Sequence, residues 1–138
     1  MSKIGKPRTS LGLATLCARV AEDKLSKNTF ILELTKIEIA PADYFVICSC
    51  DSESQVRAIC ESISMKCKEL GLQPPRTEGL ALSRWVLLDF FDVVVHIMLQ
   101  KIREYYQLEK LWGDAKFYKL TVEGKPEHIK DILIKNIY

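Results

Sequence analysis

The sequence is poor in the groups from which metal centres and phosphate-binding sites are usually built. It has only two histidines, and its five cysteines form no Cys-x-x-Cys pair. It also lacks Gly-x-Gly-x-x-Gly, the phosphate-binding Gly-x-x-x-x-Gly-Lys loop, His-Glu-x-x-His and a nucleophile elbow. These absences argue against a zinc site, a nucleotide-binding loop and the common hydrolase sites, so we expect no cofactor, no bound metal and no catalytic residues.

Long apolar runs are missing too. No stretch approaches the about 20 apolar residues that a membrane-spanning helix needs, and the first residues lack the apolar core of a secretory signal. The cysteines are odd in number and lie within apolar segments, which favours free buried thiols over disulfides. We therefore expect a cytoplasmic protein that does not bind a membrane.

Composition and charge favour one globular domain with a protein partner. The 138 residues are 48% apolar and 28% charged, which suits a single domain with a hydrophobic core. Residues 1–27 carry six basic and two acidic residues, residues 28–100 six and ten, and residues 101–138 eight and six. The acidic middle favours a basic protein partner over direct sequence-specific nucleic-acid binding. A merely solvated surface with uneven charge fits this distribution equally well.

Two amphipathic helices are predicted from capping signals and apolar spacing. The first begins near Thr9 or Ser10, where apolar residues start to recur three and four apart. The second follows Ser52, which forms a capping box with Gln55, and ends at Gly71.

Four strands are predicted from alternation and from short apolar runs. They cover residues 30–34, 44–48, about 84–89 and about 93–99, and the last two form a hairpin. Together with the helices they predict an α/β fold, a single layered domain with a mixed sheet flanked by helices.

The predicted hairpin has two different faces. One face is uniformly aliphatic and should belong to the core. A two-residue connection would pair Asp89 with Asp92 and Trp85 with His96 on the other face, with Met98 beyond them. Facing carboxylates repel each other unless a cation approaches, so this face suits a basic protein partner. The alternative is that helices cover both faces and that His96 is hydrogen-bonded in the interior.

The segment after the hairpin is apolar on two sides if it forms one helix. Either the chain breaks near Gln107 and both halves pack internally, or one side contacts another chain. Tyr, Trp and Arg are enriched at the energetic centres of interfaces, which makes this segment and the hairpin the candidate partner-binding site. The candidate residues are Trp85, Asp89, Asp92, His96, Met98, Arg103, Tyr105, Tyr106, Leu108, Glu109, Leu111 and Trp112.

A series of short motifs runs from the second predicted strand to the end of this segment. The motifs are Asp43 to Ile47, Ser52 with Gln55, Val56 and Ala58, Glu78-Gly79, Trp85 to Asp89, Asp92 to His96, Arg103 to Tyr106 and Leu108 to Trp112. In this order and spacing they resemble the ribosomal silencing factor (Iojap-related) family. The resemblance places the family's domain in residues 1–116 and leaves residues 117–138 as an extension.

The resemblance implies a topology related to nucleotidyltransferases without their catalytic motif, and a homodimer when the protein is free. It also implies binding to the large ribosomal subunit through ribosomal protein fourteen of that subunit. Bound there, family members block joining of the small subunit and repress translation when nutrients run short.

Two positions and the extension depart from the family's pattern. Cys50 and Phe91 stand where family members usually have Gly, which puts the local turn geometry in question because Gly tolerates positive φ. In the extension, Pro126 followed by Ile129, Ile132, Leu133 and Ile137 predicts a short amphipathic helix.

A nucleotidyltransferase-like enzyme is the alternative function. That chemistry needs a Gly-Ser signature followed closely by an Asp-x-Asp pair and a further carboxylate to hold two metal ions. Here no Asp-x-Asp follows Cys50-Asp51-Ser52. The sequence therefore favours a repressor without catalytic activity.

Overall fold

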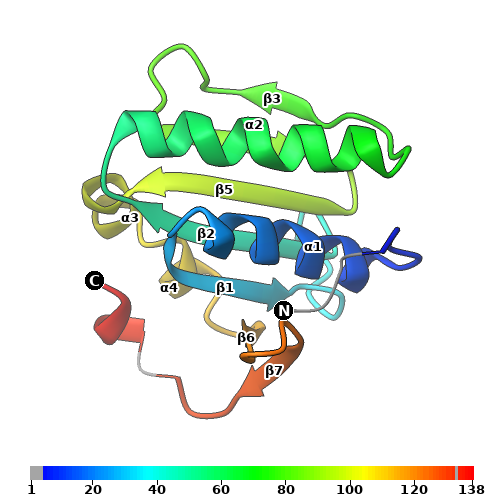
Figure 1. Ribbon diagram of the computed structural model, residues 1–138. Coiled ribbons are helices and arrows are strands. Elements are labelled where there is room, and N and C mark those ends of the chain that lie inside the picture. Colours follow the sequence, from blue (N-terminus) through cyan, green and yellow to red (C-terminus); the bar gives the residue numbers. More distant parts are fainter. Residues whose placement is uncertain (1–4, 133) are drawn as a thin grey trace.

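Two capped helices cover one face of the sheet in the computed structural model, which describes residues 5–132 and 134–138 (Figure 1). Helix α1 (Ser10–Asp23) begins after Thr9, whose hydroxyl accepts a 2.9 Å hydrogen bond from the Gly12 amide. Helix α2 (Glu53–Glu69) begins after Ser52, whose hydroxyl accepts from the Gln55 amide at 3.1 Å. The capping signals therefore predicted both helix starts correctly.

Seven strands form one mixed sheet in the order β3-β4-β5-β2-β1-β6-β7. Their bounds are β1 (Lys27–Glu33), β2 (Tyr44–Cys50), β3 (Arg76–Glu78), β4 (Trp85–Asp89), β5 (Val93–Leu99), β6 (Lys116–Leu120) and β7 (Pro126–Ile129). Strands β2 and β5 pair in parallel, whereas the other neighbouring pairs are antiparallel. The predicted α/β fold with a mixed sheet and flanking helices is confirmed.

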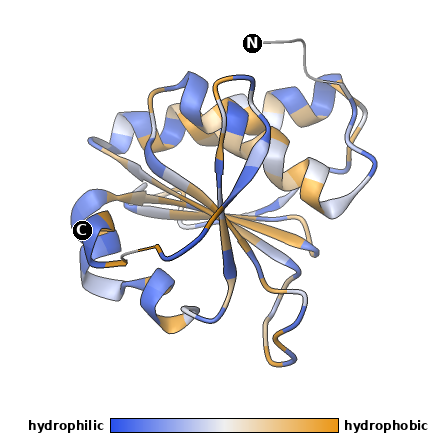
Figure 2. Cartoon of the chain, turned by 90° about the horizontal axis from the view of Figure 1, so that it is seen from below, coloured by the Kyte–Doolittle hydropathy of each residue, from blue (hydrophilic) through white to orange (hydrophobic). Residues whose placement is uncertain are grey.

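The sheet separates two hydrophobic cores. One lies beneath α1 and α2, which Figure 2 shows together on the same side of the sheet. The other is covered by α3 (Gln100–Tyr106), α4 (Leu108–Leu111) and a 3₁₀ helix, η1 (Ile134–Ile137). Every residue of β2 is buried, because this central strand has core on both faces.

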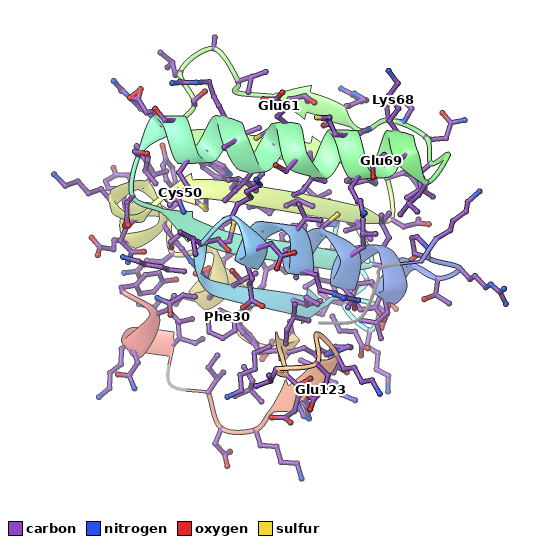
Figure 3. All side chains as sticks on the ribbon, viewed as in Figure 1. Phe30, Cys50, Glu61, Lys68, Glu69 and Glu123 are labelled. Atoms are coloured by element: carbon purple, nitrogen blue, oxygen red, sulfur yellow. The ribbon has the colours of Figure 1, made fainter. Side chains whose placement is uncertain are left out.

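The outer side of α2 is charged and exposed. Figure 3 labels Glu61, Lys68 and Glu69 on this helix, and all three are exposed.

Among the helices of the described residues, none is long and apolar enough to cross a bilayer.

All five cysteines are free and buried, as predicted. They belong to the core beneath α1 and α2. Burial raises the pKa of the Cys60 thiol to about 12 and that of Cys17 well above its usual value. The thiols of Cys17 and Cys60 therefore remain protonated at neutral pH, and the buried cysteines act as small apolar side chains.

The β4–β5 hairpin has a different register from the predicted one. The turn is centred on Phe91 and Asp92 rather than on Phe90 and Phe91, so Trp85 lies opposite Met98 and Asp89 opposite Val94. The predicted facing pair of Asp89 and Asp92 is therefore wrong, although the division of the strands into two faces holds because the register moves by two residues.

The side chain of Asp89 contributes to the shifted turn. Its carboxylate accepts a 2.8 Å hydrogen bond from the amide of Phe91, which lies at φ 77°. An Asx turn of this kind favours a left-handed residue. Phe91 thus has a backbone conformation that suits glycine. Cys50, in contrast, lies within β2 and is not among the residues with positive φ.

Replacing Phe91 with glycine should raise the free energy of unfolding by about 0.5–1 kcal/mol, because the exposed phenylalanine is held in a conformation that costs an L side chain energy. Urea unfolding measures the change. Phe90→Gly is the matched control and should lower stability, since Phe90 packs against the core. A loss of stability on Phe91→Gly would contradict this reading of the turn.

The predicted helix after Pro126 is wrong. Residues Pro126–Ile129 form β7, which pairs with β6, and β6 pairs with β1. Only the four-residue η1 is helical in this region, and Leu133, part of the predicted helix, lies outside the described residues. The sheet thus continues past residue 116.

The apolar segment after β5 breaks at Gln107, one of the two arrangements considered from the sequence. Gln107 adopts the left-handed conformation, φ 48° and ψ 57°, and separates α3 from α4. Ile102, Leu108 and Trp112 pack against the second core as a result. Tyr105, Tyr106 and Leu111 stay exposed, so only part of the segment packs internally.

Candidate protein-binding surface

Three aromatic side chains from β4 and α3 form a stack that reaches the solvent, which we call the aromatic surface: Trp85, Tyr105 and Tyr106. The rings of Trp85 and Tyr106 have centroids 4.8 Å apart, and those of Tyr105 and Tyr106 are 4.9 Å apart. Tyr105 is 80% exposed and Tyr106 53% exposed. Large aromatic groups held against one another but open to solvent are typical of interface anchors.

His96 supports this surface from the interior. Its Nδ1 accepts a 3.2 Å hydrogen bond from the indole Nε1 of Trp85, and its ring contacts Phe45 edge to face at 4.5 Å. Burial lowers the pKa of His96 to about 3. The imidazole is therefore neutral at physiological pH, which leaves Nδ1 free to accept the indole proton and fixes the orientation of Trp85.

Lowering the pH from about 6.5 to about 5 should cost roughly 2 kcal/mol of stability through His96. The folded pKa lies below the unfolded value, so the unfolded chain binds a proton that the folded chain does not. This contribution is complete above the unfolded pKa and is lost as the pH falls toward the folded one. An NMR titration should show a His96 imidazole that stays neutral to about pH 4; protonation near pH 6.5 in the folded protein would contradict the prediction.

A buried ion pair holds the two short helices together across the break at Gln107. The Nε of Arg103 donates to Glu109 Oε1 at 3.3 Å, and both side chains are 0% exposed. Arg103 Nη1 also donates to Ser49 Oγ at 2.9 Å, and the guanidinium lies over the ring of Phe30, labelled in Figure 3. This network ties α3 and α4 to β1 and β2.

The structure therefore corrects four of the candidate partner-binding residues. His96, Met98, Arg103 and Glu109 are buried, so their side chains cannot contact a partner in this conformation. The face of β5 with His96 and Met98 is covered by α3 and α4. Arg103 and Glu109 turn inward to form their ion pair.

The remaining candidates are spread over two places. Trp85, Leu108 and Trp112 are half-buried, and Leu111 is exposed on α4. Asp89 and Asp92 lie at the β4–β5 turn, whereas Trp85 begins β4 at the other end of the strand. The two aspartates therefore do not belong to the aromatic surface.

Sequence reasoning missed two exposed leucines just before β4. Leu80 and Leu82 lie in the loop that precedes β4 and are 46% and 65% exposed. The signal available was the pair of leucines within a segment predicted as loop, since exposed apolar residues in a loop often mark a contact site.

The aromatic surface is built from apolar and hydrogen-bonding groups. In the described part of the chain, no group of three or more His, Cys, Asp or Glu side chains is placed to hold a metal ion. The groups nearest to Trp85 and Tyr106 are aromatic rings and a neutral imidazole, which supply apolar contact and hydrogen bonds. The arrangement is that of an α/β domain with an aromatic contact surface at one end of its sheet.

Comparisons with known proteins identify the family. Residues 7–133 match the family model for "Ribosomal silencing factor during starvation", so the chain belongs to the ribosomal silencing factor family. The match continues through β6 and β7.

Individual relatives agree with this assignment. The Bacillus subtilis (strain 168) ribosomal silencing factor is 43% identical over 100 residues, covering 72% of this chain and 84% of the relative. A crystal structure of a Chromobacterium violaceum protein superimposes with a TM-score of 0.71 at 34% identity, covering 76% of this chain and 87% of that one. The Mus musculus protein named "Mitochondrial assembly of ribosomal large subunit protein 1" is 33% identical over 97 residues, covering 65% of this chain and 42% of the relative.

Proposed function

We propose that this protein represses translation by binding the large ribosomal subunit through ribosomal protein fourteen of that subunit, where it blocks joining of the small subunit. Family membership supports a role as a ribosomal silencing factor. The mouse relative, named for assembly of the large subunit, supports that subunit as the target. The observation that carries the contact itself is the exposed stack of Trp85, Tyr106 and Tyr105.

The binding energy would come from a few aromatic anchors. Tyr105 and Tyr106 present large rings with little freedom to lose on binding, because Trp85 already supports Tyr106. The acidic middle of the chain, with ten acidic and six basic residues in 28–100, suits a basic ribosomal protein and would steer its approach.

We assign no catalytic step to the protein. The alternative of a nucleotidyltransferase-like enzyme would need carboxylates that converge on two metal ions. The Asp89 carboxylate instead accepts the amide of Phe91 within its own turn, and the relatives bear the names of silencing factors. The acceptor role of Asp89 is structural, which favours the repressor.

A subunit-joining assay tests the block directly. Purified large and small subunits are mixed at a magnesium concentration that supports joining, and sucrose gradients measure the fraction of joined ribosomes. Adding the protein to the large subunits first should lower this fraction in proportion to its occupancy. Unchanged joining at saturating protein would contradict the proposed block.

The free protein is proposed to form a homodimer in the cytoplasm, as the family resemblance implies. Analytical ultracentrifugation measures the association state directly. A single species at the 15.8 kDa mass of one chain across the micromolar range would contradict the dimer.

A further inference from the structure

The segment that ends at Tyr138 packs against the helices next to the aromatic surface. The side chain of Ile137 is buried, and its carbonyl accepts hydrogen bonds of 3.4 Å from Asn28 Nδ2 and from Gln100 Nε2. Asn28 belongs to β1 and Gln100 begins α3. The segment is therefore fastened both to the sheet and to the start of the helix that carries Tyr105 and Tyr106.

The next residue reaches the buried ion pair. The hydroxyl of Tyr138 donates a 2.7 Å hydrogen bond to Glu109 Oε1, the same oxygen that accepts from Arg103 Nε at 3.3 Å. Burial and the hydrogen bond to Glu109 raise the pKa of Tyr138, so the phenol stays protonated and remains a donor. Tyr138, Glu109 and Arg103 thus form one continuous network.

This network contacts α4, a helix too short to be stable without contacts to the rest of the domain. Helix α4 has four residues, Leu108–Leu111, far fewer than an isolated helix needs. It follows the left-handed Gln107, and Glu109 is its fully buried polar contact with the rest of the domain. The orientation of α4 relative to α3 therefore depends on the partners of the Glu109 carboxylate as well as on the packing of Leu108 and Trp112 against the second core.

We propose that Tyr138 is a positioning residue that, through Glu109, holds α4 and the end of α3 in the orientation that presents the aromatic surface to the ribosomal partner. The hydrogen bond to Glu109 leaves the carboxylate with two donors, one from α3 and one from beyond β7. Losing the phenol leaves α4 with a weaker anchor. The effect on the partner rests on the proposed function, whereas the effect on α4 does not.

Hydrogen exchange on the free protein tests the positioning without a ribosome. Tyr138→Phe removes the hydroxyl alone, and we expect amides in residues 108–112 to exchange about 5–10-fold faster while β5 amides are unchanged. Tyr118→Phe is the matched control, because its hydroxyl also contacts a carboxylate, Glu33 at 3.5 Å, on a different strand pair. It should leave residues 108–112 unchanged. Equal exchange in Tyr138→Phe and the wild type would overturn the proposal.

Binding to purified large subunits is measured on the same variants. Tyr138→Phe should weaken binding about 3–10-fold at equal folded concentration, and Tyr118→Phe should bind like the wild type. Faster exchange in 108–112 with unchanged affinity would overturn the positioning role. A wild-type protein that fails to bind large subunits would refute the proposed function, while the exchange result would still decide whether Tyr138 holds α4.

Discussion

Replacing Glu109 with alanine should lower the free energy of unfolding by about 3–5 kcal/mol, the largest loss expected from a single substitution on this side of the sheet. Arg103 and Glu109 are both fully buried, so the truncation leaves a guanidinium in the interior without its countercharge. It also removes the acceptor of the Tyr138 hydroxyl. Urea unfolding followed by circular dichroism measures the change.

Glu104→Ala is the control for that substitution. Glu104 directly follows Arg103 in the sequence but is exposed, and it accepts a surface hydrogen bond from Gln100 Nε2. Its removal should change stability by less than about 0.5 kcal/mol. The double replacement Arg103→Leu with Glu109→Leu should lose less than the sum of the two single changes, because neither charge is then left alone. A Glu109→Ala loss below about 1 kcal/mol would mean that the pair does not hold α3 and α4 together.

Replacing Tyr106 with alanine should weaken binding to the large subunit by about 2 kcal/mol, close to 30-fold, with a loss of folding stability below about 1 kcal/mol. Tyr106 is more than half exposed, so the free protein depends on it little. Its ring contacts the ring of Trp85, however, and this contact restricts the position of Tyr106 before a partner binds. Binding to purified large subunits and thermal unfolding of the same sample separate the two effects.

Val122→Ala provides the matched comparison. Val122 is 91% exposed and lies in the turn between β6 and β7, at the other edge of the sheet from β4. It should bind large subunits as the wild type does. If Tyr106→Ala lost several kcal/mol of stability and its folded fraction bound normally, Tyr106 would be a core residue and the aromatic surface would be misplaced.

Local signals predicted the first half of the fold well. The hydroxyl of Ser52 and the amide of Gln55 form the capping contact that their spacing indicated, and the central β2 is the apolar run that the sequence shows. Such elements are predictable because their signals lie within a few residues of one another. The apolar residues of α2 that face the sheet were predictable for the same reason.

Strand β6 was missed because its partner β1 is distant in sequence, and β7 because it is added to the sheet only through a short hairpin with β6. Ile31 of β1 pairs with Tyr118, and Phe117 pairs with Ile129. The apolar residues after Pro126 fit a helical spacing equally well when read alone. Pairing of β6 with β1 decides for strand, and the apolar spacing after Pro126 does not contain that information.

The structure brings together only some of the predicted site residues. Trp85, Tyr105 and Tyr106 do come together, because they lie on the half-buried face of β4 and on the outer side of α3. The interior position of Arg103 could not be predicted from the sequence, because Arg103 and Glu109 are six positions apart. That spacing does not bring two side chains together on one helix. Its burial depends on the break at Gln107 and on Glu109 beyond it.

Co-sedimentation with separately purified ribosomal subunits tests the central claim most directly. The wild-type protein is mixed with large or with small subunits at physiological salt, pelleted through a sucrose cushion and quantified in each pellet. We predict saturable recovery with large subunits, little with small subunits, and strongly reduced recovery of Tyr106→Ala at equal folded concentration. Equal recovery with both subunits, or none with the large one, would contradict the assignment of this protein as a repressor that binds the large subunit.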